Sequence, residues 1–152
     1  MKPTERIKEA QRVLEAEAKA IFASSKNIGL NFSRCVDLII DCKGKVVISG
    51  IGKSGNIGRK MTSTLASLGT PSIFLHTSDA FHGDLGILRK NDLLILISNS
   101  GETDELVRLL NYANNNGIKS IAITGKIDST INKKATGTLN AVVENEACPL
   151  NL

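Results

Sequence analysis

Two segments of this chain place glycine, hydroxyl and amide groups directly after an apolar run. Residues 50–55 read Gly-Ile-Gly-Lys-Ser-Gly and follow the run at 45–49, and residues 98–103 read Ser-Asn-Ser-Gly-Glu-Thr and follow the run at 92–97. Main-chain N–H groups at the start of a helix carry partial positive charge, and small hydroxyl side chains add hydrogen-bond donors. Each segment therefore predicts a place for a phosphate group, and together they indicate a phosphate-ester ligand.

The 50–55 segment also matches the G-x-G-x-x-G pattern of dinucleotide-binding domains. That reading expects an acidic residue at the end of the next strand, where this chain has His76. Gly-Lys-Ser at 52–54 hints at a P-loop, but Val47 stands where the earlier glycine is required. Lys53 is better placed to reach a phosphate or a reacting oxygen, so a nicotinamide dehydrogenase is a distant alternative.

The 98–103 segment has a structural interpretation beside the functional one. Ser98 or Ser100 would then simply cap the following helix. Glu102 and Glu105 are three residues apart, which predicts a shared helix face and is typical of first-turn acids that a helix dipole favours. We expect this ordinary role for at least one of the two, and Glu105 lies one turn into the predicted helix.

The chain has two histidines. His82 lies in Asp-Ala-Phe-His-Gly-Asp-Leu-Gly at 79–86, a polar turn whose glycines would allow close approach to a ligand. A hydrogen-bonded loop histidine is the plain alternative, and His76 and His82 alone make a weak metal site. Glu146 follows the last predicted strand, at the same sheet edge as the phosphate segments, and for Cys148 we favour a packing role.

These residues must be positioned by an alternation of helices and short apolar strands. A stripe of apolar residues from Ile7 to Ile21 predicts an amphipathic helix over 3–25, and a second helix is expected over 31–41. The predicted strands are 45–49, 72–75, 92–97, 119–123 and 139–143, and the later helices are 55–68, 102–116 and 129–135. Continuous apolar runs are typical of parallel strands that helices cover on both faces. We therefore predict an α/β fold, a three-layer sandwich around a doubly wound, five-stranded parallel sheet.

Composition limits the possible functions. The 152 residues are 41% hydrophobic, enough for one core. The net charge is +4, but the 19 Lys and Arg residues are scattered and only four Phe and one Tyr are present, which argues against nucleic-acid binding. No apolar run approaches the roughly 20 residues that span a bilayer, so no membrane is expected. Three cysteines without a Cys-x-x-Cys pair favour a reducing, cytoplasmic location.

Four motifs in order resemble the sugar isomerase (SIS) domain of arabinose 5-phosphate isomerases. They are Gly-Ile-Gly-Lys-Ser-Gly, Phe-His-Gly-Asp-Leu-Gly, Ser-Asn-Ser-Gly-Glu-Thr and Glu-Ala-Cys-Pro-Leu, and the resemblance covers about 45–152. It implies a flavodoxin-like SIS domain over 45–152. Residues 1–44 resemble the family's N-terminal helices, which pack on the domain and help to assemble a homotetramer with sites shared between subunits.

The resemblance implies interconversion of D-ribulose 5-phosphate and D-arabinose 5-phosphate through a cis-enediol, toward the Kdo sugar of lipopolysaccharide or capsule. The matching catalytic positions are Lys53, His82, Glu105 and Glu146. The matching substrate-binding positions are Gly52, Ser54, Gly69, Thr70, His76, Ser98, Asn99, Ser100 and Thr103. No cofactor is required, although His76 could take up an adventitious zinc ion.

In this interpretation Lys53 stabilises the enediolate oxygen, Glu105 or Glu146 moves the proton, and His82 assists ring opening or proton transfer between hydroxyls. The family pattern continues after Cys-Pro-Leu with another histidine and often a regulatory CBS pair, so we expect a truncated domain. Two alternatives stay open: an SIS isomerase for another sugar phosphate, and a non-catalytic SIS domain that senses a sugar phosphate. A sensor would need a DNA-binding segment, for which the first 44 residues lack room.

Overall fold

The computed structural model describes residues 2–143 and 147–148 and forms two compact units. The first unit comprises residues 1–29 and 142–152, and the second comprises residues 30–141. The first contains helix α1 (Pro3–Ser25), and the second contains the sheet and the remaining helices. Residues 30–44, which the sequence analysis grouped with the N-terminal helices, lie in the same unit as the sheet.

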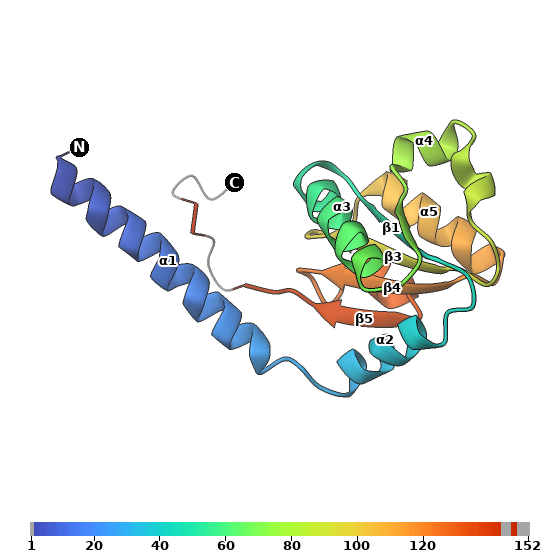
Figure 1. Ribbon diagram of the computed structural model, residues 1–152, viewed down its shortest axis with the longest axis horizontal. Helices are drawn as coiled ribbons and strands as arrows, with labels where there is room; N and C mark the ends of the chain where they lie inside the picture. Colours follow the sequence, from blue (N-terminus) through green and yellow to red (C-terminus); the bar gives the residue numbers. More distant parts are fainter. Residues whose placement is uncertain (1, 144–146, 149–152) are drawn as a thin grey trace. The chain divides into compact units, whose positions relative to one another are not determined.

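A five-stranded parallel sheet forms the centre of the larger unit (Figure 1). Its strands are β1 (Val46–Gly50), β2 (Ser72–Phe74), β3 (Leu93–Ser98), β4 (Lys119–Thr124) and β5 (Gly137–Asn140), in the order β2-β1-β3-β4-β5. All four strand pairs are parallel. The order reverses between β1 and β3, which is where doubly wound sheets bind their ligands.

Helices cover both faces of the sheet, because the central strands are apolar on both sides. Leu94 and Leu96 belong to one core cluster, while Leu93, Ile95 and Ile97 belong to the other. Helices α2 (Leu30–Ile40) and α3 (Gly52–Ser67) supply the second cluster; α4 (Thr77–Phe81), α5 (Asp104–Asn115) and α6 (Thr130–Lys134) supply the first. The predicted three-layer α/β sandwich is confirmed.

Some predicted boundaries were wrong, and each has a local cause. Helix α3 begins at Gly52 rather than 55, because Gly52 adopts a left-handed φ of 58° and the chain turns there directly out of β1. The expected polar turn at 79–86 is mostly helical, with α4 followed by the 3-10 helix η1 (Asp84–Ile87). Strand β5 ends at Asn140, where its pairing with Thr124 ends, instead of continuing through Val142 and Val143.

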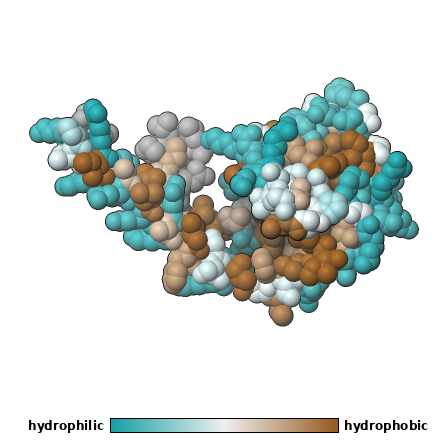
Figure 2. Space-filling view, viewed as in Figure 1, coloured by the Kyte–Doolittle hydropathy of each residue, from teal (hydrophilic) through white to brown (hydrophobic). Residues whose placement is uncertain are grey.

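Helix α1 is amphipathic, as predicted, and Pro3 occupies its first turn. Its large apolar side chains are exposed: Ile7 is 59%, Leu14 65% and Ile21 72% exposed. Figure 2 shows hydrophobic surface between hydrophilic residues along this helix. Within the same unit, Arg12 pairs with Glu9 and donates a hydrogen bond to the carbonyl of Ala147. In the described part of the chain, no helix has the length and apolarity to cross a bilayer.

Candidate functional site

Helices α3 and α5 begin side by side at the carboxyl edge of the sheet, because they follow the neighbouring strands β1 and β3. A cavity of about 310 Å³ lies between these two helix starts. Its lining comes from the segment after β1 and from the segment around the end of β3: Ile51, Ser54, Ile97, Ser98, Asn99, Ser100, Thr103 and Leu106. The phosphate segments predicted from sequence thus share one cavity at the point where the strand order reverses.

The hydroxyl groups of the 98–103 loop hold the loop itself in shape. The Oγ of Ser98 accepts a hydrogen bond from Gly101 N at 3.0 Å and lies 3.1 Å from Thr103 Oγ1. The Oγ of Ser100 accepts a hydrogen bond from Glu102 N at 3.2 Å. The capping alternative for these serines was therefore wrong, since they bond loop N–H groups that precede α5.

The start of helix α5 has no side-chain cap. Thr103 occupies the N-cap position, but its hydroxyl lies against Ser98 and makes no capping hydrogen bond. Ile51, the N-cap of α3, has no side chain that could cap. Among the residues that the structure describes, no side chain accepts from the first-turn N–H groups of either helix, and this arrangement suits an anion.

Lys53 lies in the first turn of α3 and is not among the lining residues of either cavity at this edge, although its two chain neighbours are. Ser54 lines the cavity described above, and Gly52 lines a neighbouring cavity of about 250 Å³. The Lys53 side chain is exposed, and no described residue forms an ion pair with it. An unpaired ammonium at this edge can approach the oxygen atoms of a bound ligand.

The neighbouring cavity contains polar side chains that the sequence analysis did not single out. Asn56 and Arg59 of α3 line it, together with Phe74 and His76. The Arg59 guanidinium lies over the Phe74 ring, with 4.3 Å between the guanidinium carbon and the ring centroid. The local sequence could not predict the contact between Arg59 and Phe74, because Phe74 belongs to β2 and lies beside α3 only in the folded chain.

His76 lies at the start of α4 and lines this second cavity. Its Nδ1 accepts a hydrogen bond from Ser78 N at 3.2 Å. The neutral ring that makes this bond carries its proton on Nε2, which makes Nε2 a donor. Among the described residues, no three His, Cys, Asp or Glu side chains lie close enough together to hold a metal ion.

Several predicted residues lie away from the two cavities. His82 is exposed at the end of α4, and Glu105 is exposed in the first turn of α5. Gly69 and Thr70 precede β2, so they lie at the amino edge of the sheet, opposite the cavities. Glu146 lies outside the described residues.

Glu102 and Glu105 do not share a helix face, so that prediction was wrong. Helix α5 begins only at Asp104, because Gly101 adopts a left-handed φ of 63° and turns the loop before the helix starts. Glu102 Oε1 instead accepts a hydrogen bond from Thr130 N at 2.8 Å. The hydrogen bond from Thr130, together with the charges of Lys133 and Lys126, lowers the pKa of Glu102.

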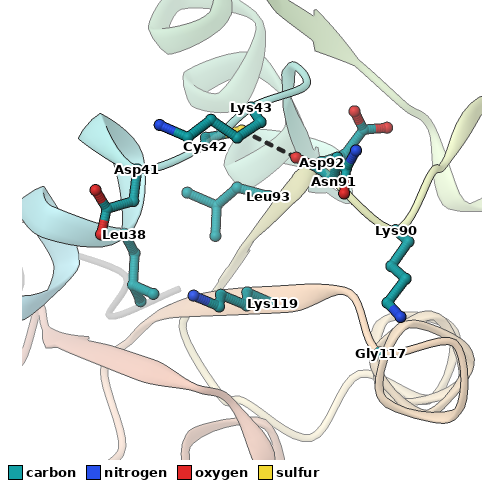
Figure 3. A pocket seen from close by; sticks show the side chains of 10 residues that line it. All are labelled: Leu38, Asp41, Cys42, Lys43, Lys90, Asn91, Asp92, Leu93, Gly117 and Lys119. Atoms are coloured by element: carbon teal, nitrogen blue, oxygen red, sulfur yellow. Dashed lines mark hydrogen bonds between the residues drawn. The ribbon is translucent and has the colours of Figure 1, made fainter.

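The amino edge of the sheet carries a cavity of about 270 Å³ with three lysines in its lining. Figure 3 shows that these ammonium groups do not converge: those of Lys43 and Lys119 lie on the side of Asp41, and that of Lys90 lies beside Gly117. The three lysines therefore do not provide one common anion site in this cavity.

The carboxylate of Asp92, in the wall of the amino-edge cavity, is hydrogen-bonded to other groups of the protein. Its carboxylate accepts hydrogen bonds from Lys45 Nζ at 2.7 Å, Lys45 N at 3.0 Å and Arg89 N at 2.9 Å. Burial acts to raise the pKa of Asp92, but these hydrogen bonds and the Lys45 charge together lower it. The pair is a structural ion pair, with the Asp92 side chain 3% exposed.

The parallel sheet and the hydroxyl-rich cavity at its β1–β3 edge define an α/β domain with a site suited to a phosphate ester. The model of the SIS domain family matches residues 38–151, and the chain belongs to this family. The predicted resemblance is confirmed.

Named relatives agree with this membership. The chain is 48% identical over 147 residues to the Escherichia coli arabinose 5-phosphate isomerase KpsF, covering 96% of this chain and 45% of the relative. It is 44% identical over 146 residues to the Pseudomonas aeruginosa arabinose 5-phosphate isomerase KdsD, with the same coverage. The chain thus spans less than half the length of these curated relatives.

A solved structure resembles the whole chain. The E. coli CFT073 protein c3406, solved in complex with arabinose 5-phosphate, superposes with a TM-score of 0.94 at 38% identity, covering all of this chain and 81% of the other.

Proposed function

We propose that this chain is the SIS domain of an arabinose 5-phosphate isomerase, which interconverts D-ribulose 5-phosphate and D-arabinose 5-phosphate. The observation that carries the proposal is the cavity between the starts of α3 and α5, lined by Ser54, Ser98, Ser100 and Thr103. Two uncapped helix starts and several hydroxyl groups supply the donors that a phosphate monoester needs. The names of the relatives support the substrate.

The phosphate group would anchor the substrate so that its carbonyl end extends toward the first turn of α3. Lys53 would then lie near the carbonyl oxygen, where negative charge develops as the enediolate forms. This placement is consistent with an exposed ammonium that has no carboxylate partner among the described residues.

The reaction needs a base that moves one proton between neighbouring carbons. A carboxylate removes the proton from C2 of the open-chain aldose, and the C2–H electrons form the enediolate as the carbonyl oxygen gains charge. The proton then returns to C1, while the proton of the C2 hydroxyl is transferred to the C1 oxygen, so that C2 becomes the carbonyl of the ketose. Glu105 and Glu146 are the proposed bases, and His82 would assist ring opening or proton transfer between hydroxyls. Glu105 is unpaired among the described residues.

The proposal also covers pathway, location and cofactors. We propose that the reaction precedes Kdo synthesis and takes place in the cytoplasm. It would require no cofactor, and a zinc ion at His76 would be adventitious. The proposed assembly is a homotetramer with sites shared between subunits, and Gly69 and Thr70 would contact substrate in that assembly. The exposed apolar residues of α1, spaced seven apart at Ile7, Leu14 and Ile21, support a helix-mediated interface.

Turnover in heavy water tests the reaction and the substrate together. The chain is incubated with D-ribulose 5-phosphate and followed by proton NMR. We expect arabinose 5-phosphate that carries deuterium at C2, because a base that exchanges with solvent returns the proton. Parallel incubations with sedoheptulose 7-phosphate and fructose 6-phosphate should show no conversion. Conversion of one of these instead of ribulose 5-phosphate would contradict the assigned substrate.

A further inference from the structure

The 98–103 loop is held by hydrogen bonds to a second loop, defined here as residues 125–131, which follows β4 and includes the first two residues of α6. The strongest tie is the hydrogen bond of 2.8 Å that Glu102 Oε1 accepts from Thr130 N. Thr130 is the first residue of α6, so its N–H has no acceptor within that helix. Glu102 therefore satisfies a donor at the start of α6 with a group that lies next to the phosphate-binding hydroxyls.

Two further contacts hold the same pair of loops. The carbonyl of Gly101 accepts a hydrogen bond from Ile131 N at 3.1 Å, and the carbonyl of Asn99 accepts one from Gly125 N at 3.0 Å. A Cβ at Gly101 would overlap the side chain of Ser129. The 98–103 loop is thus fixed at residues 99, 101 and 102, without space to shift toward the 125–131 loop.

Movement of Glu102 would be transmitted to the serine hydroxyls. The N–H of Glu102 donates to Ser100 Oγ, and the N–H of Gly101 donates to Ser98 Oγ. A displacement of residues 101–102 therefore breaks or reorients the bonds that orient both hydroxyls. Ser98 and Ser100 line the cavity, whereas Glu102 does not.

The same contact separates the roles of the two glutamates. The Glu102 carboxylate is engaged with α6, and hydrogen bonding to Thr130 lowers its pKa, so it is ionised at neutral pH and is a poor proton acceptor. Glu105 has no such partner among the described residues. Of these two glutamates, Glu105 is therefore the one available for proton transfer.

We propose that Glu102 is a positioning residue, whose bond to the main-chain N–H of Thr130 holds the 98–103 loop in the conformation that binds the phosphate of the substrate. The inference rests on the proposed function, because it assumes that a sugar phosphate binds in this cavity. Glu102 acts through Ser98 and Ser100 and does not contact the reacting atoms.

The bond can be broken from either side. Glu102→Ala removes the acceptor, while Glu102→Gln keeps a carbonyl oxygen that can accept the same bond. Thr130→Pro removes the donor at a position where proline suits the helix start, and Ser129 already has the extended backbone (φ −70°, ψ 158°) that precedes proline. Thr130→Ala keeps the N–H but removes the hydroxyl, which also contributes to the lowered pKa of Glu102. Asp104→Ala, which removes a neighbouring exposed acid, is the matched control.

Affinities for inorganic phosphate and for arabinose 5-phosphate are measured by NMR titration of each variant, with KM and kcat measured beside them. We expect Glu102→Ala and Thr130→Pro each to weaken both affinities about 5- to 10-fold, the range of one lost hydrogen bond. KM should rise by a similar factor while kcat changes less than about 2-fold. The double variant should be no weaker than either single variant, because both remove the same bond. Glu102→Gln and Asp104→Ala should stay within about 2-fold of the parent chain, and Thr130→Ala, which keeps the main-chain bond, should lose less affinity than Thr130→Pro.

The outcomes separate this inference from the proposed function. If the parent chain binds both ligands and Glu102→Ala and Thr130→Pro bind them equally well, the positioning role is overturned and the proposed function stands. Additive losses in the double variant would also overturn it, since they would show two independent effects. If the parent chain binds neither ligand, the proposed function fails, and the inference fails with it.

Discussion

The two edges of the sheet use polar residues in opposite ways. At the amino edge, the Asp92 carboxylate takes three hydrogen bonds from Lys45 and Arg89 N, so its charge is satisfied within the protein. At the carboxyl edge, Lys53 has no carboxylate partner among the described residues, and two helix starts have no side-chain cap. Charge that is paired within the protein thus indicates a role in stability, whereas donors without internal acceptors indicate a binding site.

Loss of the Lys53 charge should produce the largest effect. For Lys53→Met we expect kcat to fall about 10³-fold, because a charged donor at a developing oxyanion is lost. The free energy of unfolding should change by less than about 0.5 kcal/mol, since the side chain is exposed. Steady-state kinetics and urea unfolding measure the two quantities, with Lys60→Met on the same helix as the control. Full activity of Lys53→Met would remove the lysine from the mechanism.

At the amino edge we expect a loss of stability without a loss of ligand affinity. Asp92→Asn should lower the free energy of unfolding by about 2 kcal/mol, because an amide N–H₂ would face buried donors. The affinity for arabinose 5-phosphate should stay the same in the folded variant. Urea unfolding and ligand titration test both parts. A weakened affinity with unchanged stability would reverse the assignment of the two edges.

We expect Ser98 to have both a structural and a binding role, because its hydroxyl is hydrogen-bonded within the 98–103 loop and its side chain lines the cavity. Ser98→Ala leaves Gly101 N without its acceptor, and we expect phosphate affinity to fall about 10-fold. Phosphate titration by NMR measures this loss, and Ser67→Ala, at an exposed position, is the control. Unchanged affinity would show that the loop keeps its shape without this hydroxyl.

The smallest expected effect is a change with pH in the stability difference between the parent chain and Asp92→Asn. The folded-state pKa of Asp92 is lowered, so its contribution is fully present above the unfolded carboxyl pKa of about 4. The contribution is lost as the pH falls from there through the folded pKa. Unfolding curves at pH 7 and 5 should therefore show the same difference, and those below about pH 4 a smaller one. A difference that shrinks between pH 7 and 5 would be inconsistent with the lowered pKa.

The fold was predictable from local patterns. The run Leu93–Ile97 is apolar at every position, and this predicted a strand covered on both faces. The order of such runs with helices between them then led to the parallel sheet and to its ligand-binding edge. Ser98 and Ser100, which line the cavity, were singled out because they stand directly after such a run. Lys53 was singled out for the same reason, and its role stays a prediction.

Other features depended on contacts between distant segments. The partner of Glu102 is Thr130, 28 residues away, and spacing alone placed Glu102 on a helix face with Glu105. Arg59 meets Phe74 only because α3 packs beside β2. The short helix α4 has no long apolar period that could have predicted it, since it spans five residues.

The sugar-phosphate site at the carboxyl edge can be tested by an NMR titration of the chain with arabinose 5-phosphate, followed at the main-chain amides. We expect the largest shifts at residues 51–54 and 98–103, with little change at Gly44 and Gly117 on the amino edge. Shifts centred on Gly44 and Gly117, or no shifts at either edge, would contradict a sugar-phosphate site between the starts of α3 and α5.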